Sequence, residues 1–167
     1  MKEWLWCAML LVGAGACAGV SAEAPLLIAP GQSRDATVAA LQHHEFCRPK
    51  HPPAAVETYP RCDRPGSEDG DAWVQAEYRE DQLVELRRFE RYTSAAVASS
   101  RWNQLVAAYG EHAPISEAAR AAYRAKRKLP AGVKRWVAVQ WKDAICAIFL
   151  LTPASDEAPA LLENVIR

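Results

Sequence analysis

The stretch Ala72–Tyr92, AWVQAEYREDQLVELRRFERY, carries the strongest structural pattern in this chain of 167 residues. Its apolar side chains Val74, Ala76 and Tyr78 alternate with polar ones, and a second apolar run begins at Leu83 after a short charged segment. Alternation with a period of two residues on both sides of a polar turn predicts an antiparallel hairpin with one buried face. Because an isolated hairpin is only marginally stable in water, other segments must cover that face.

Helices are predicted at four places outside this hairpin. Three of them begin at a serine or threonine, whose side-chain oxygen accepts a hydrogen bond from a free backbone N–H group at the helix start. These helices are expected to run from Ser33 to about Glu45, from Thr93 or Ser94 to Gly110, and from Ser116 to about Lys128. A short amphipathic helix is expected over Asp156–Arg167, around Leu161, Leu162, Val165 and Ile166.

A second hairpin is predicted over Val133–Leu151, turning at Lys142 and Asp143. The proline-rich segment between Cys47 and Asp71 allows at most one short edge strand, near Val56–Tyr59. Hairpins that alternate with helices predict an α+β fold, with one antiparallel sheet of about four to five strands and the helices packed on one face.

The first 22 residues predict a secretory signal peptide. Lys2 precedes a short apolar run and a stretch of small residues, and Val20-Ser21-Ala22 has small residues at the spacing for cleavage before Glu23. The apolar run is too short to span a bilayer as a mature helix. The expected organisation is therefore a signal peptide at 1–22, a tether at 23–32 and a single α+β domain at 33–167.

A second interpretation of the N-terminus uses Cys17. The sequence Ala14-Gly15-Ala16-Cys17 resembles a bacterial lipobox, which would make Cys17 the lipidated first residue of a lipoprotein. An uncleaved anchor is the third alternative. The chain is expected to be periplasmic or secreted, or else tethered to the outer membrane through Cys17, which would be its one contact with a membrane.

Export changes the interpretation of the cysteines. Cys47 and Cys62 flank the proline-rich loop, and in an oxidising compartment they are the expected disulfide. Cys146 lies in an apolar strand and is expected to be a small buried hydrophobic residue. The alternative is a zinc site in which His43, His44 and His51 join the two loop cysteines, but neither a CxxC nor an HxxxH spacing is present. We therefore expect no metal.

The chain carries no recognised catalytic signature. Glycine-rich nucleotide loops and GxSxG elbows are absent from the sequence, so we expect no catalytic residue and no cofactor. Twenty basic and twenty acidic side chains cancel, which removes any global field for nucleic acid. Any partner would have to be attracted by a local patch.

Two candidate interaction surfaces remain. On the first predicted strand Trp73, Gln75, Glu77 and Arg79 share the face opposite to the apolar one, and they form a contact strip. Basic residues also cluster around the third predicted helix, where the expected contacts are Arg120, Arg124, Arg127 and Lys128. A solvated helix surface and a docking patch for an acidic partner both agree with such a cluster.

The layout of these segments resembles a known family. A signal or lipobox, a short tether, Gly31-x-Ser33 opening a helix, a hairpin, and Leu105-Val106-Ala107-Ala108-Tyr109-Gly110 followed by a proline resemble small bacterial envelope proteins of the BamE/SmpA type. These proteins share a fold with the β-lactamase inhibitor proteins. The resemblance covers about residues 28–152, and it implies a non-enzymatic role in binding other envelope proteins.

The expected function is accordingly that of an exported envelope protein that acts as a protein-interaction module. The alternative is an exported protein that binds a small ligand, or a small hydrolase, using a cleft near the 47–71 loop.

Overall fold

The computed structural model describes residues 24–48, 52–62, 72–152 and 158–167. These residues form three helices and six strands: α1 (Arg34–His43), β1 (Val56–Pro60), β2 (Ala72–Arg79), β3 (Gln82–Arg91), α2 (Ala95–His112), α3 (Glu117–Lys126), β4 (Val133–Trp141), β5 (Ala144–Leu151) and β6 (Ala160–Ile166). The strands form one antiparallel sheet in the order β1-β2-β3-β6-β5-β4. The predicted α+β class is confirmed, but the sheet has six strands where four to five were expected.

Both predicted hairpins are present, and β1 is the predicted short edge strand. In the β2–β3 hairpin the two turn residues Glu80 and Asp81 have φ values of 50° and 61°. A two-residue turn with both residues in the left-handed region matches the right-handed twist of the flanking strands. The charged turn therefore closes the hairpin at the place where the alternation stops.

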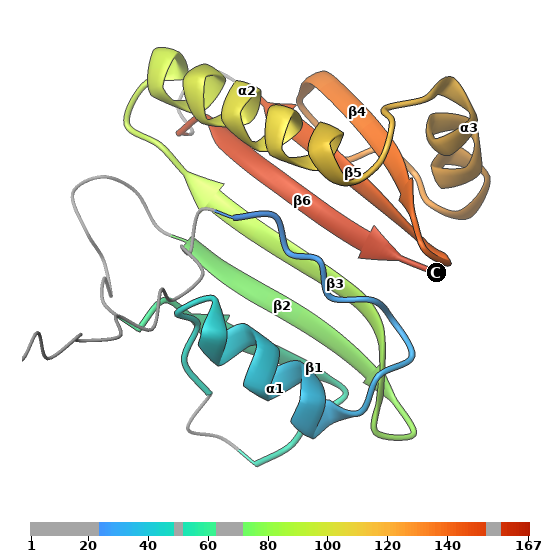
Figure 1. Ribbon diagram of the computed structural model, residues 1–167. Coiled ribbons are helices and arrows are strands. Elements are labelled where there is room, and N and C mark those ends of the chain that lie inside the picture. Colours follow the sequence, from blue (N-terminus) through green and yellow to red (C-terminus); the bar gives the residue numbers. More distant parts are fainter. Residues whose placement is uncertain (1–23, 49–51, 63–71, 153–157) are drawn as a thin grey trace, which may run out of the picture.

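The C-terminal segment is a strand, and the helix predicted over 156–167 is wrong where the structure describes it. Strand β6 lies between the two hairpins and pairs with both β3 and β5 (Figure 1). Leu161 and Val165 face one side of the sheet, whereas Leu162 and Ile166 face the other. A strand buried on both faces is apolar without alternation, so its pattern resembles that of a short helix.

Helices cover both faces of the sheet, so the prediction that they pack on one face is wrong. Helices α1 and α2 lie on the face seen in Figure 1, and they share a core with Cys146, Ile148 and Leu150. Helix α3 packs on the opposite face, where Tyr123 joins a second core with Phe149. Strand β5 is apolar at every position, and a strand of this kind needs cover on both sides.

Residues 24–32 belong to the folded domain, which corrects the predicted tether. The segment runs along β3 between α1 and α2 (Figure 1), and Leu26 and Ile28 are buried in the core. The backbone N–H of Leu26 donates to Glu163 at 2.7 Å, and Arg88 donates to the carbonyl of Ala24 at 2.8 Å. The low periodicity of this segment reflects its extended backbone, not exposure to solvent.

The three predicted N-caps are confirmed, and Ser94 rather than Thr93 starts the second helix. The hydroxyl oxygens of Ser33, Ser94 and Ser116 each accept a hydrogen bond from a backbone N–H three residues on. Gly110 does not end α2 as expected. The helix continues through this glycine to His112 and stops before Pro114, since a residue that precedes proline disfavours the helical region.

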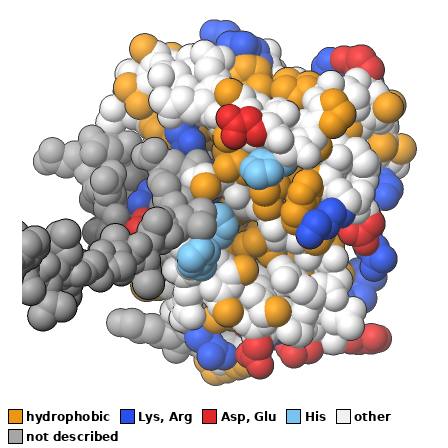
Figure 2. Space-filling model, viewed as in Figure 1, with side chains coloured by type: hydrophobic (Ala, Val, Ile, Leu, Met, Phe, Trp, Pro, Cys, Tyr) orange, Lys and Arg blue, Asp and Glu red, His pale blue; other side chains and the backbone are white. Residues whose placement is uncertain are grey.

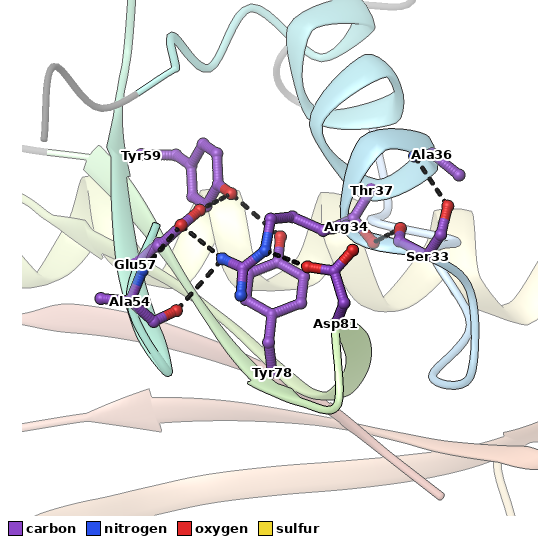
Figure 3. A network of polar contacts seen from close by, with 9 residues as sticks. All are labelled: Ser33, Arg34, Ala36, Thr37, Ala54, Glu57, Tyr59, Tyr78 and Asp81. Carbon is purple, nitrogen blue, oxygen red and sulfur yellow. Dashed lines mark hydrogen bonds and ion pairs between the residues drawn. The ribbon is translucent and has the colours of Figure 1, made fainter. Parts of the chain in front are cut away.

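Arg34 fastens the start of α1 to the edge of the sheet (Figure 3). Its Nε atom lies 2.6 Å from the carboxylate of Asp81 in the hairpin turn, and its Nη1 atom donates to the buried carboxylate of Glu57 on β1. The guanidinium also lies 4.0 Å from the centre of the Tyr78 ring. Glu57 accepts a further hydrogen bond from the hydroxyl of Tyr59. One arginine thus joins a helix, a turn and an edge strand.

A network of buried charges lies beneath α2. Arg88 on β3 forms an ion pair with Glu163 on β6 at 2.5 Å, and its Nε atom lies 3.3 Å from Glu90. Arg101 on α2 donates two hydrogen bonds to Glu90, at 3.1 and 3.2 Å. Burial alone would raise the pKa of Glu90, but the charges of Arg88 and Arg101 outweigh it and lower the pKa to about 2.

His44, which caps the C-terminal end of α1, is also buried. Burial and the nearby charges of Arg88 and His43 lower its pKa from 6.5 to about 4. His44 is therefore neutral at pH 7 in the folded protein.

Figure 2 shows the outer surface of the α1 and α2 side. Hydrophobic side chains gather across the middle of this view, and most charged side chains lie near its edge. Leu27, Val106 and Trp141 are partly buried and pack against the core beneath. The face of the sheet that carries α1 and α2 is therefore covered by hydrophobic packing.

Replacing Leu26 tests whether the N-terminal segment belongs to the fold. Leu26→Ala should lower the free energy of unfolding by about 2–5 kcal/mol, because it leaves a cavity in the core. Leu27→Ala, at a half-buried neighbouring position, should cost less than about 1 kcal/mol. Urea denaturation of both variants checks this, and equal losses would contradict the packed segment.

His44 makes stability depend on pH. Because its pKa is lower in the folded state than in the unfolded state, the contribution of His44 to stability is greatest above pH 6.5 and falls as the pH drops toward about 4. The expected slope approaches about 1.4 kcal/mol per pH unit in this range. His44→Gln should flatten the slope between pH 6.5 and 4.5 in urea titrations, and an unchanged slope would assign the effect to other groups.

Candidate functional site

One half of the sheet carries no described helix on the face opposite to α1 and α2. On that face α3 covers β4, β5 and β6, whereas β1, β2 and β3 present their side chains outward. We call this bare region the open half-face. It comprises Val56, Thr58, Pro60, Trp73, Gln75, Glu77, Glu85, Arg87 and Phe89.

A row of large side chains crosses all six strands on this face. Neighbouring strands place these residues directly opposite one another, in the order Pro60, Trp73, Phe89, Leu162, Phe149 and Trp136. The row contains two stacked aromatic pairs, with ring centres 5.1 Å apart in the first pair and 5.5 Å apart in the second. Helix α3 covers the second pair, Trp136 and Phe149, through Tyr123. The first pair, Trp73 and Phe89, has no such cover among the described residues.

A groove of about 440 Å³ lies beside the uncovered aromatic pair. Arg91 lies over the Trp73 ring, with its guanidinium carbon 4.9 Å from the ring centre. The other residues of the groove are small or aliphatic: Ala131, Leu151, Ala158 and Ala160. A groove with an aromatic wall and a cationic rim can hold an apolar side chain next to a negatively charged group.

Glu85 connects the open half-face to α3. Its buried carboxylate accepts hydrogen bonds from Arg87 at 2.7 Å, from Arg127 at 2.9 Å and from Asn164 at 2.8 Å. Burial alone would raise the pKa of Glu85, but these hydrogen bonds outweigh it and hold the pKa below its usual range. Tyr123 donates to Asn164 at 2.6 Å. Glu85 is therefore the point at which the end of α3 is attached to the sheet.

The structure places three of the four predicted strip residues together. Trp73, Gln75 and Glu77 are half-buried on the open half-face, and Arg79 is exposed at the hairpin end of the same strand. Sequence reasoning missed Glu85, Arg87 and Phe89, which lie opposite Glu77, Gln75 and Trp73, respectively. A shift of register between Glu77 and Tyr78 breaks simple counting from the turn, so the alternation alone does not find these partners.

The predicted basic residues occupy different positions around α3. Arg120 bonds Glu117 at 2.5 Å and lies 4.6 Å from the centre of the Trp136 ring, and Arg124 lies 5.7 Å from the same ring centre. Arg127 is the residue that pairs with Glu85, and Lys128 is exposed. Arg120 and Arg124 therefore lie over the far edge strand β4, and α3 reaches the open half-face at its C-terminal end, through Arg127.

Cys47 and Cys62 form the predicted disulfide, with their Cα atoms 5.0 Å apart. The bond joins the end of α1 to the end of β1, and it removes both thiolates from the zinc site considered above. Cys146 is buried and unpaired, as expected. Cys17 and His51 lie outside the described residues. Among the described residues, no group of three His, Cys, Asp or Glu side chains is arranged to hold a metal ion.

No family model, curated protein or solved structure matches this chain. Within the described part of the chain, none of the helices has the length and apolar character needed to cross a membrane.

Removing the Glu85 charge should loosen α3. Glu85→Gln should lower the free energy of unfolding by about 1–3 kcal/mol, because charge-assisted hydrogen bonds to two arginines are weakened at a buried site. Glu77→Gln, at the half-buried position directly opposite, should change it by less than about 0.5 kcal/mol. Urea denaturation with amide hydrogen exchange of 117–126 checks this. Equal effects of the two variants would contradict the role of Glu85.

Proposed function

We propose that this chain is an exported bacterial envelope protein that binds another protein through the open half-face and catalyses no reaction. The observation that carries the proposal is the uncovered aromatic pair Trp73 and Phe89, on a face whose matching pair is covered by α3. A tryptophan and a phenylalanine stacked on a sheet with no described helix above them are typical of the centre of a protein–protein interface.

The surroundings of the pair support a binding role. Gln75 and Thr58 supply polar groups next to the aromatic row, and exposed basic residues follow at the end of α3. An apolar centre with a polar and charged rim is the usual anatomy of an interface. The resemblance to proteins of the BamE/SmpA type favours the same function.

A small apolar ligand in the groove is the second candidate. Its volume of about 440 Å³ falls within the range of small-molecule sites. The cleft near the 47–71 loop that the sequence indicated lies largely outside the described residues, whereas the groove begins at Trp73, just after that loop. Native mass spectrometry of the purified protein would distinguish this candidate by an added small mass.

Site-specific photo-crosslinking in the native host tests the proposed function. A photoreactive amino acid at Gln75 should capture another polypeptide in the envelope fraction, because Gln75 lies in the middle of the open half-face. The matched control places the same group at Ala39, an exposed position on α1 on the other side of the sheet. Capture at Ala39 but not at Gln75 would contradict the proposal.

A further inference from the structure

We propose that the binding partner presents a single acidic amphipathic helix of about ten residues, which lies on the open half-face alongside α3. This inference rests on the proposed function and specifies the chemistry of the partner. It is carried by the dimensions of the bare region, by the way α3 packs on the other half, and by the charges along α3.

The bare region has the dimensions of one helix. Strands β1, β2 and β3 are neighbours, so the two outer strands lie about 10 Å apart, close to the diameter of a helix. Along β3, the open half-face extends from Phe89 to Glu85, which is about 13 Å of strand. A helix rises about 1.5 Å per residue, so about nine residues cover that length. Helix α3, which covers the other half, has ten residues.

The packing of α3 shows which side chains this kind of surface accepts. Ala119 is buried and Ala122 is partly buried against the sheet, and Tyr123 lies on the covered aromatic pair with ring centres 5.4 Å from Phe149 and 5.9 Å from Trp136. Small residues let the helix approach the sheet, and one large side chain fills the space beside the aromatic rings. The groove beside Trp73 and Phe89 offers the corresponding space for one large apolar side chain of the partner.

The charges at the C-terminal end of α3 favour an acidic partner helix. On the open half-face itself, Glu77 and Glu85 balance Arg87 and the attached Arg127. Excess positive charge comes from the C-terminal end of α3, where Lys126 and Lys128 flank Arg127, are exposed and form no ion pair with any described residue. A helix lying beside α3 would place its own side chains next to these cations, and carboxylates at those positions would form ion pairs with them.

The same charges disfavour a second copy of this chain as the occupant. Two copies that covered each other's open half-face would bring their α3 helices side by side. The basic ends of both helices would then lie near each other, and like charges at an interface cost several kcal/mol. The partner therefore carries apolar residues opposite Trp73 and Phe89 and carboxylates about two turns along its helix, opposite Lys128.

Two crosslinking positions test the partner helix. The photoreactive group is placed at Gln75 in one variant and at Lys128 in another, and the crosslinked peptides from the native envelope are sequenced by mass spectrometry. We expect both positions to map onto one segment of one protein, with Asp or Glu at the Lys128 crosslink and apolar residues at the Gln75 crosslink. Unlinked segments, a non-acidic segment or a second copy of this chain would overturn the inference.

Charge and packing variants complete the test on full-length protein crosslinked at Gln75. Trp73→Ala and the pair Lys126→Glu with Lys128→Glu should each lower capture of that segment about tenfold or more, as expected for interface hot spots. Lys134→Glu, on the far edge strand β4, is the matched control and should leave capture unchanged. Equal loss in the control would overturn the assignment of charge to the end of α3.

The outcomes separate this inference from the function on which it rests. Capture of a partner at Gln75 through a segment that is not an acidic helix would leave the binding function intact and overturn only the helix. Absence of capture at Gln75, with capture at Ala39, overturns the binding function itself. Sedimentation with vesicles rich in phosphatidylglycerol identifies a membrane as the occupant: binding that needs Lys126 and Lys128 but not Trp73 would overturn the protein partner.

Discussion

The ion pair between Arg88 and Glu163 holds the two halves of this protein together. The two residues lie directly opposite each other on β3 and β6, the central strands of the sheet. Their remaining polar atoms bind the backbone of the N-terminal segment and the hydroxyl of Tyr109 on α2. Removal of one partner from a buried pair of this kind is strongly destabilising, because it leaves an uncompensated charge. The first hairpin, the C-terminal strand, α2 and residues 24–32 thus all contact this one ion pair.

The two faces of the sheet differ in how they are covered. On one face, two helices and the N-terminal segment cover the strands, and buried charges are matched within the core. On the other face, α3 covers three strands and ends at Glu85, where the bare surface begins. This difference in cover does not leave Trp73 and Phe89 fully exposed, because the two rings stack on each other and remain half-buried. It leaves a partly apolar, grooved surface next to the basic C-terminal end of α3.

Sequence patterns predict the elements that are determined by interactions between residues close together in the chain. The structure contains three features predicted in this way: the alternation around Val74, the serine caps, and the cysteine pair that flanks the proline-rich loop. The strand β6 could not be found in this way, because Glu163 and Asn164 are polar yet buried, and only their partners on β3 and α3 explain them. Arg88 and Glu90 likewise face the core although their side chains are charged. The residues of the open half-face can be identified only from the register of β2 against β3, and a β-bulge shifts that register.

The central position of β6 has a consequence for the timing of folding. Strand β6 is synthesised after both hairpins, and each hairpin uses it as its only neighbour from the other half of the sheet. Until β6 is available, the hairpins can form separately but cannot join, and pairings across a large sequence separation form slowly. A chain with this topology completes its sheet only after β6 has been synthesised. In the exported protein proposed above, that delay would keep the chain in a state in which it can pass through a channel.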